Sequence, residues 1–502
     1  MPEFLHAVGT GFSWVLVVFV LVGAIPVLAA AYQFALVAFH FRRNHYPGCA
    51  PFFPRTAILV PAWNEAMVIG ASIDRLMQLN YPQESLRVFV VDDASTDDTP
   101  DVIMAKADEY PGQVFHLRRT KGGEGKSHTL NHGLRIILED DWMQALLIMD
   151  ADVIYEPDSL RKMTRHLSDP DVGAVTAYIK EGSRPGNYLT RFIGFEYITA
   201  QAAARRSQNV LGAVACLAGG AQLHSRANLE AIGGRIDTSS LAEDTFTTFK
   251  TQMTGRRVIF EPHAAVWAEE PGDIGGLWKQ RLRWARGNVQ VTRQFARVWC
   301  RPSRIHRLGS ISFSLFWFSL FLLPLLMILA SASLIALYFA NFPMAWVTFH
   351  LLWIINALTY VFITSYVIMI DWRTGRHAWL QGILFPGAIS LAIIIAACFP
   401  GLLRMIFHQA LPLAGVVLTP AEHRGLVLFA YAWLALSMVV AYLGKVIEPH
   451  RFGRLLSPAF IYIAGYGPLL CACTFASYLK ELRGADMTWD KTEKTGKVSM
   501  PI

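Results

Sequence analysis

The chain has 502 residues, of which 53% are hydrophobic and 17% charged, and its formal net charge is +7. This composition is too apolar for an ordinary soluble enzyme of that length. Charged residues are concentrated between positions 55 and 300, with long uncharged runs on either side, so the sequence predicts one soluble domain set between membrane segments. Because many Arg and Lys residues flank the apolar runs, the positive charge indicates membrane orientation, and we expect no nucleic-acid partner.

The first apolar run, Phe12–Phe41, is long enough for one span but too short for a hairpin of two, since a span needs about twenty residues. Pro26 lies within it, so we expect one long or kinked helix. Arg42 and Arg43 follow the run directly. Positive charge on that side places the soluble domain in the cytoplasm.

Apolar runs return after the soluble domain. The predicted spans are Ile311–Phe339, Trp346–Ile370, Ala378–Phe399, Leu426–Gly444 and Leu456–Tyr478. We expect Asp371–His377, which holds two arginines, to be a cytoplasmic loop, and Gly401–Gly425 to be interfacial or re-entrant. If all five runs cross the membrane completely, the C-terminus lies outside.

Strand and helix patterns alternate in the soluble domain. Short runs rich in Val, Ile and Leu end in polar residues in "RTAILVPAWNE" (55–65), "LRVFVVDDASTDDT" (86–99) and "QALLIMDADV" (144–153). Helical patterns over Ala66–Leu79 and Lys126–Leu138 lie between them. This alternation predicts an α/β domain with a parallel sheet, helices on both faces, and a ligand site beyond the carboxyl ends of the strands.

Acidic residues gather at that edge. Asp150 and Asp152 follow a buried strand, and carboxylates in this position favour Mg²⁺ or Mn²⁺, although an exposed turn is the alternative. "TKGGEGKS" (120–127) lacks the first glycine of a phosphate-binding loop, because Thr120 stands in its place. Lys126 at a helix start either contacts a phosphate or is an exposed loop lysine.

Two further motifs carry charged residues. Glu243 or Asp244 in "LAEDTF" is either a general base or one of an acid pair at a helix N-terminus. "QRLRW" (280–284) lies on the amphipathic stretch Leu277–Val298, whose alternative role is an interfacial helix. The six cysteines form no C-x-x-C pair, so we expect buried thiols and neither a disulfide framework nor a zinc site.

Four motifs of this chain resemble, in the same order, those of the membrane-embedded, processive family-2 glycosyltransferases. They are Asp92–Asp93, Asp150–Asp152, Glu243–Asp244 and Gln280–Trp284. This group includes the synthases of cellulose, chitin, hyaluronan and poly-N-acetylglucosamine. The resemblance implies a GT-A-like domain with a Rossmann-type, mostly parallel sheet between transmembrane helices. The expected parts are an N-terminal helix and linker (1–54), the glycosyltransferase domain (55–275), an interfacial region with Q-x-x-R-W (276–310), channel helices (311–480) and a cytoplasmic tail (481–502).

The resemblance also implies roles for individual residues. Asp244 would be the catalytic base, and Asp152 with Asp150 would hold Mg²⁺ or Mn²⁺. The donor would be bound by Asn64, Glu65, Asp93, Lys126, Asp150 and Arg283, and the acceptor by Gly219, Gly220, Glu243, Gln280 and Trp284. Ala242 departs from the Thr or Gly of many members. "TWDKTEK" (488–494) resembles a gating element with Trp489 and Thr492, which requires a cytoplasmic tail and therefore an even number of crossings after the domain.

The implied function is an inverting, processive β-glycosyltransferase that polymerises a UDP-sugar, with UDP-glucose or UDP-N-acetylglucosamine as donor. The product would cross a bacterial inner membrane, with the growing polysaccharide, membrane lipids and accessory secretion or regulatory subunits as partners. The alternatives are a non-processive transferase that acts on a lipid-linked acceptor and a pure transporter, which would not need Asp244. The sequence names neither the sugar nor the linkage.

Overall fold

The computed structural model describes residues 2–413, 417–486, 496 and 498. The chain forms two compact units, of which one comprises Ala35–Ser314 with Lys480–Ile502 and the other Met1–Phe34 with Leu315–Leu479. The first contains the residues that the sequence predicts to be catalytic and is called the catalytic unit below, and the second is called the apolar unit. The predicted gating residues Trp489 and Thr492 lie outside the described residues.

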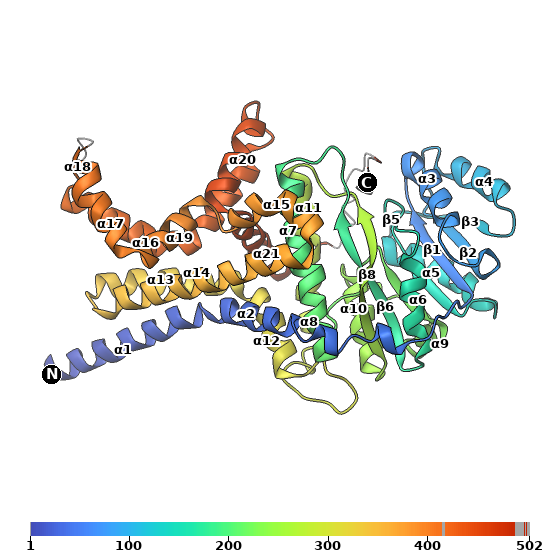
Figure 1. Ribbon diagram of the computed structural model, residues 1–502, viewed down its shortest axis with the longest axis horizontal. Coiled ribbons are helices and arrows are strands. Elements are labelled where there is room, and N and C mark those ends of the chain that lie inside the picture. The colour runs from blue at the N-terminus through green and yellow to red at the C-terminus, as the bar shows by residue number, and fades with distance from the viewer. Residues whose placement is uncertain (1, 414–416, 487–495, 497, 499–502) are drawn as a thin grey trace. The chain divides into compact units, whose positions relative to one another are not determined.

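The catalytic unit is built on one sheet, ordered β3-β2-β1-β4-β7-β6-β8-β5. Figure 1 labels β1, β2, β3, β5, β6 and β8. The strands are β1 (Thr56–Ala62), β2 (Leu86–Asp92), β3 (Val114–Arg118), β4 (Ala145–Ile148), β5 (Ile154–Tyr155), β6 (Val172–Glu181), β7 (Gln222–Ser225) and β8 (Arg257–Ala268). Pairs β3-β2, β2-β1, β1-β4 and β6-β8 are parallel, whereas β7 runs antiparallel to both β4 and β6, and β5 to β8. The sheet is mostly parallel, as predicted, and has the mixed pattern of a GT-A-like fold.

Helices connect these strands. They are α3 (Ala66–Met77), α4 (Thr99–Glu109), α5 (Lys126–Glu139), α6 (Ser159–Thr164), α7 (Tyr188–Tyr197), α8 (Ala204–Leu211), α9 (Arg226–Ala231), α10 (Glu243–Met253) and α11 (Ile274–Gln294). Shorter helical turns are η1 (His40–Arg42), η2 (Tyr46–Gly48), η3 (Gln83–Ser85), η4 (Arg165–Ser168) and η5 (Ile198–Ala203). The predicted helices Ala66–Leu79 and Lys126–Leu138 match α3 and α5 to within two residues.

One face of the sheet is covered by α5. Leu130, Leu134 and Ile137 repeat at helical spacing and pack with strand residues such as Leu59 and Leu146 in one buried cluster. Burying a side chain of this size contributes about 1.5–3 kcal/mol. The packing fixes the N-terminus of α5, and with it Lys126, beyond the ends of β1 and β4.

The apolar unit consists of helices. They are α1 (Pro2–Val22), α2 (Ile25–Val37), α12 (Ile311–Phe321), α13 (Leu323–Phe339), α14 (Met344–Ile370), α15 (Trp372–Ile383), α16 (Ala388–Cys398), α17 (Pro400–Met405), η6 (Ile406–Ala410), α18 (Leu411–Leu413), α19 (Pro420–Ile447), α20 (Gly453–Ala464) and α21 (Tyr466–Leu482). α2 and α21 each end in the catalytic unit and α12 begins in it. Leu334, Leu352 and Trp433, from three of these helices, lie in one buried cluster.

Three helical stretches are individually long and apolar enough to cross a membrane: Thr10–Val37, Met344–Ile370 and Pro420–Ile447. Three bent pairs raise this number to six among the described residues if each pair is one span. The pairs α12/α13, α15/α16 and α20/α21 bend by 67°, 74° and 96°. The chain is therefore a membrane protein by the length and composition of its helices.

The prediction of a loop at Asp371–His377 is wrong, because this segment forms the beginning of α15. Asp371 caps the helix by accepting a hydrogen bond from the Thr374 amide at 3.1 Å. A capping carboxylate satisfies backbone donors that no helical carbonyl reaches. The segment therefore begins a helix although it is highly charged.

Candidate active site

A cavity of about 440 Å³ lies within the catalytic unit, beyond the carboxyl ends of β1 and β4. Parallel strands bring their following loops to one edge of the sheet, and α10 and α11 complete the wall. Of the sequence-predicted site residues, the structure brings the following to this cavity: Glu65, Lys126, Asp150, Asp152, Gly219, Gly220, Glu243, Asp244, Gln280, Arg283 and Trp284.

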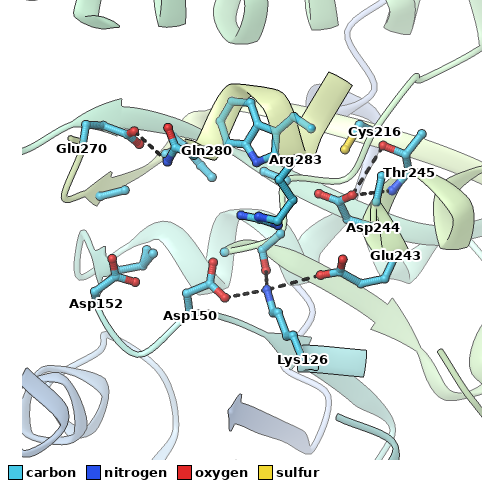
Figure 2. A pocket seen from close by; sticks show the side chains of 18 of the residues that line it. Lys126, Asp150, Asp152, Cys216, Glu243, Asp244, Thr245, Glu270, Gln280 and Arg283 are labelled. Atoms are coloured by element: carbon cyan, nitrogen blue, oxygen red, sulfur yellow. Dashed lines mark hydrogen bonds and ion pairs between the residues drawn. The ribbon is translucent and has the colours of Figure 1, made fainter. Parts of the chain in front are cut away.

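Lys126 lies among carboxylates (Figure 2). Its Nζ is 2.5 Å from Asp150 Oδ1 and 3.6 Å from Glu243 Oε1, and it donates to the Gly219 carbonyl at 3.2 Å. Burial alone lowers the pKa of a lysine, but the charges of Asp150 and Glu243 outweigh this effect and raise the pKa of Lys126. The ammonium therefore stays charged, and the alternative of an exposed loop lysine is wrong.

Two glycines leave room beside these charges. A Cβ atom at Gly219 would lie 3.4 Å from both Asp244 Oδ2 and Lys126 Nζ. A Cβ atom at Gly220 would lie 2.9 Å from Val153 Cγ2 and 3.4 Å from Asp150 Oδ2. Larger side chains at these positions would fill the space between these charged groups, so the small residues keep the cavity open.

Glu243 and Asp244 begin α10 and differ in their surroundings. Glu243 is buried, and this burial raises the pKa of its carboxyl group against the opposing effect of Lys126. Asp244 Oδ1 accepts the Thr245 amide at 2.7 Å, while Oδ2 faces the space beside Gly219. The Asp244 charge, after burial itself, also raises the pKa of the neighbouring Cys216 thiol. One carboxylate is thus engaged with a lysine, and the other presents an oxygen to open space.

Helix α11 approaches the start of α10 closely. A Cβ atom at Gly287 would lie only 2.5 Å from that of Ala242, so only glycine permits this contact. The approach places Arg283 and Trp284 on the wall that Asp244 shares. The Ala242 departure noted in the sequence is therefore accompanied by a matching small residue on α11.

Hydrogen bonds orient the Q-x-x-R-W side chains. Gln280 donates to Glu270 Oε2 at 3.1 Å, and Glu270 Oε1 accepts from the Tyr197 hydroxyl at 2.5 Å. Arg281 pairs with Glu196 at 2.9 Å, and its guanidinium lies 4.2 Å from the centre of the Trp284 ring. These contacts hold Gln280 and Trp284 at the cavity wall, and the sequence did not indicate them.

Arg283 has hydrogen-bonding capacity left over. Its Nε atom is buried and has no hydrogen-bond partner among the described residues, yet the side chain lines the cavity. A buried guanidinium N–H without an acceptor is costly unless a ligand supplies one. The planar fork of arginine suits phosphate or carboxylate oxygens, so an anionic ligand fits this position.

Asn64 and Asp93 do not line this cavity. Asn64 has a left-handed backbone (φ 52°) and accepts the Thr96 amide at 2.9 Å. Asp93 is fully buried, pairs with Arg119 and accepts the Gly123 amide at 2.9 Å. Asp93 therefore anchors the glycine-rich loop that leads to Lys126, and its predicted role in donor binding stays a prediction.

The start of the C-terminal tail is fastened to α11. Arg286 pairs with Glu481 at 2.6 Å and donates to the Ala485 and Asp486 carbonyls at 2.6 and 3.0 Å. Farther along, the Gly496 amide donates to Glu269, a residue of the cavity wall, at 3.0 Å. The sequence did not predict these contacts, because nothing in the residues around Arg286 indicates a partner almost two hundred residues away.

Comparisons with known proteins find a family profile and several similar proteins. A family profile described as "Glycosyltransferase like family 2" matches residues 54–287. Residues 54–287 match a family-2 glycosyltransferase domain. It is 31% identical over 267 residues to "Probable glycosyltransferase YdaM" of Bacillus subtilis (53% of this chain, 61% of that protein). It is 29% identical over 234 residues to "Poly-beta-1,6-N-acetyl-D-glucosamine synthase" of Staphylococcus aureus (46% and 54%).

This chain therefore spans little more than half the length of these curated relatives. Among solved structures, the mannosyltransferase PcManGT from Pyrobaculum calidifontis in complex with GDP-Man and Mn²⁺ is 24% identical, with a TM-score of 0.49, over 76% of this chain and 98% of that one. The predicted family and enzyme class of the domain are confirmed by the profile and the curated relatives.

Proposed function

We propose that this protein is an inverting, processive β-glycosyltransferase that extends a polysaccharide from a UDP-sugar and passes it across the cytoplasmic membrane of a bacterium. The observation that carries the proposal is the convergence of Lys126, Asp150, Asp244, Arg283 and Trp284 on one cavity. UDP-glucose and UDP-N-acetylglucosamine are the proposed donors. The name of the S. aureus relative supports the second.

Asp244 is the proposed base. The acceptor hydroxyl oxygen forms a bond to C1 of the donor sugar, the bond from C1 to the diphosphate oxygen breaks, and Asp244 takes the hydroxyl proton. Its Oδ2 faces the space beside Gly219, where the missing side chain of glycine would leave room for an acceptor. In-line attack inverts C1, so an α-linked donor gives a β-linkage. A positioned base contributes about 10²–10⁴-fold to such a step.

The leaving UDP carries developing negative charge, and two cations of the cavity are placed to meet it. Lys126 stays charged, and Arg283 holds an N–H without an acceptor among the described residues. Preorganised donors of this kind stabilise charge that appears in the transition state. Asn64, Glu65 and Asp93 complete the proposed donor side, with Asp93 acting at least through the loop that it anchors.

The cavity also fits a divalent cation. Carboxylates outnumber cationic side chains on its wall, which bears Glu65, Asp150, Asp152, Glu243, Asp244, Glu269 and Glu270 against Lys126, Arg205 and Arg283. Asp152 with Asp150 would hold Mg²⁺ or Mn²⁺, because such ions prefer carboxylate oxygens. When bound, the ion would neutralise the diphosphate charge.

Trp284 is the proposed acceptor platform. Its indole lies against Arg281 and is fixed at the cavity wall, and a flat apolar face suits the C–H face of a sugar. Gln280, Glu243, Gly219 and Gly220 form the remainder of the acceptor side. The tail contact between Gly496 and Glu269 supports a gating role for the tail, and lipids and accessory subunits are further proposed partners.

Product analysis tests the proposal. Purified full-length protein is incubated with radiolabelled UDP-glucose, UDP-N-acetylglucosamine, other UDP-sugars or GDP-mannose, and UDP or GDP release is measured beside product length on a gel. We expect release with one UDP-sugar and a ladder of products. Release without a ladder indicates single addition to a lipid-linked acceptor, and release from GDP-mannose alone contradicts the donor assignment.

A further inference from the structure

Three side chains that commonly ligate transition metals meet away from the active-site cavity. His45 and Cys49 belong to the segment between α2 and β1, and His166 lies in η4. One ligand atom from each lies within 4.8 Å of the others. The two Nδ1 atoms of His45 and His166 are 2.8 Å apart, and Cys49 Sγ is 3.2 Å from His45 Nδ1. None of the three lines the active-site cavity.

The opposite ring nitrogens both face carboxylates. His45 Nε2 is 2.9 Å from Asp169 Oδ2, and His166 Nε2 is 2.8 Å from Glu261 Oε2. Glu261 is fully buried, and its other oxygen accepts the His263 amide at 2.7 Å. Metal-ligating histidines almost always donate their second ring nitrogen to such an acceptor, which fixes the tautomer and aims the bare nitrogen at the metal.

The two rings and the thiol do not carry enough hydrogen atoms to satisfy both Nδ1 atoms. An ionised carboxylate only accepts, so each Nε2 must carry the hydrogen of its ring, and a neutral imidazole has only one. Both Nδ1 atoms are then acceptors that face each other at 2.8 Å. The Cys49 thiol has one hydrogen and can serve only one of them. A cation between the rings, either a proton or a metal ion, resolves the conflict.

We propose that His45, Cys49 and His166 bind a zinc ion through their two Nδ1 atoms and Sγ. Zinc bonds of about 2.0–2.1 Å to nitrogen and 2.3 Å to sulfur place tetrahedral ligand atoms about 3.3–3.6 Å apart. Zinc binding would lengthen the observed Nδ1–Nδ1 distance of 2.8 Å and the Sγ–Nδ1 distance of 3.2 Å by about half an ångström. A nitrogen and sulfur ligand set suits zinc, whereas Mg²⁺ and Mn²⁺ prefer oxygen. Water takes the fourth position.

The site joins two parts of the catalytic unit. His45 and Cys49 precede β1, while His166 follows α6 and its partner Glu261 belongs to β8. The same segment is already held by Arg165, which donates to the Cys49 carbonyl at 2.6 Å and lies 4.4 Å from the Tyr46 ring centre. A bound zinc would fasten the chain that leads from the first apolar helices to the sheet. The role is structural and independent of the proposed glycosyl transfer.

The test begins with metal content. Full-length protein is purified in detergent without chelator, and zinc is measured by mass spectrometry for wild type, Cys49→Ala and the matched control Cys300→Ala, which removes an exposed thiol of the same unit. We expect about one zinc per chain in wild type and control, and less than about a tenth in Cys49→Ala, because a thiolate ligand is lost. Equal zinc in all three proteins contradicts the site.

A second measurement grades the affinity. Zinc-free protein is titrated with ZnCl₂ against a chromophoric chelator. Asp169→Asn, which changes the acceptor of His45 Nε2 and also weakens the ion pair with Arg257, should bind zinc about 10–100-fold more weakly. If Cys49→Ala does not fold, cobalt(II) added to zinc-free wild type decides the question, since a thiolate ligand gives a charge-transfer band. Wild type that carries no zinc and shows no such band holds a shared proton, and the proposal is then wrong.

Discussion

Replacing Asp244 with Asn tests the assignment of the base with little structural disturbance. The amide keeps an oxygen in the place of Oδ1, which accepts the Thr245 amide at 2.7 Å, and removes only charge and basicity. Losing a negative charge in the first turn of α10 costs about 0.3–1 kcal/mol of stability. Losing a general base costs about 10²–10⁴-fold in turnover, or about 2.7–5.5 kcal/mol in the barrier. The catalytic loss should therefore exceed the folding loss severalfold.

The matched control is Glu243→Gln at the neighbouring position. The 3.6 Å between Lys126 Nζ and Glu243 Oε1 exceeds a normal hydrogen bond, while Asp150 remains 2.5 Å from the same ammonium. The neutral side chain therefore removes a long contact worth about 1 kcal/mol. We expect Glu243→Gln to lose less than about tenfold in turnover, mainly through weaker substrate binding.

The assay is UDP release by purified full-length protein under saturating donor, with calorimetric UDP binding on the same samples. Asp244→Asn should bind UDP nearly as wild type does and turn over at less than about a hundredth of its rate. Retention of more than about a tenth of the rate, or a greater loss in Glu243→Gln, refutes the assignment of Asp244.

Three further outcomes are expected. Chelator should abolish transfer, and Mg²⁺ or Mn²⁺ without zinc should restore it; full activity in chelator, with metal content checked, removes the divalent ion from the reaction. Trp284→Ala should stop polymer formation while donor hydrolysis by water persists, and a fall of both in step with the yield of folded protein would make Trp284 a membrane anchor. Burial raises the pKa of Glu181 to about 7 from 4.5, so its protonated form adds stability at low pH that is lost as pH rises toward 7. The loss is about 3 kcal/mol, and Glu181→Gln should reduce the drop in melting temperature between pH 5 and 8; an unchanged drop contradicts the buried-acid explanation.

Much of the active site was predictable because its chemistry is written in short local motifs. Each motif spans only a few residues and either follows a strand directly or lies on a helix. The motifs are Asp150 with Asp152, the pair Glu243–Asp244, and Q-x-x-R-W. Their local context predicts the edge of the sheet at which they gather. The first span, with its break before Ile25, and the apolar runs after position 311 likewise follow from composition.

Other features were missed because local sequence carries weak signals for them. The four-residue strand β7 enters the sheet antiparallel between β4 and β6, and so short a run cannot be distinguished from a loop by periodicity. The bends between α15 and α16 and between α20 and α21 were not expected either. Gly387 and Gly465 lie at these breaks with φ of 90° and 108°, and the lone glycines in apolar runs gave only a weak hint of them.

The sequence by itself determined the residue types of the site, the order of strands and helices along the chain, and the apolar segments, since these depend on local periodicity and chemistry. Only the tertiary structure decided that Lys126 lies between Asp150 and Glu243, that Asp93 is buried against the loop before α5, and that His45 and Cys49 meet His166. Such meetings depend on strand order and on which helix packs on which face. Many side-chain contacts jointly decide these arrangements, and no single stretch of sequence records them.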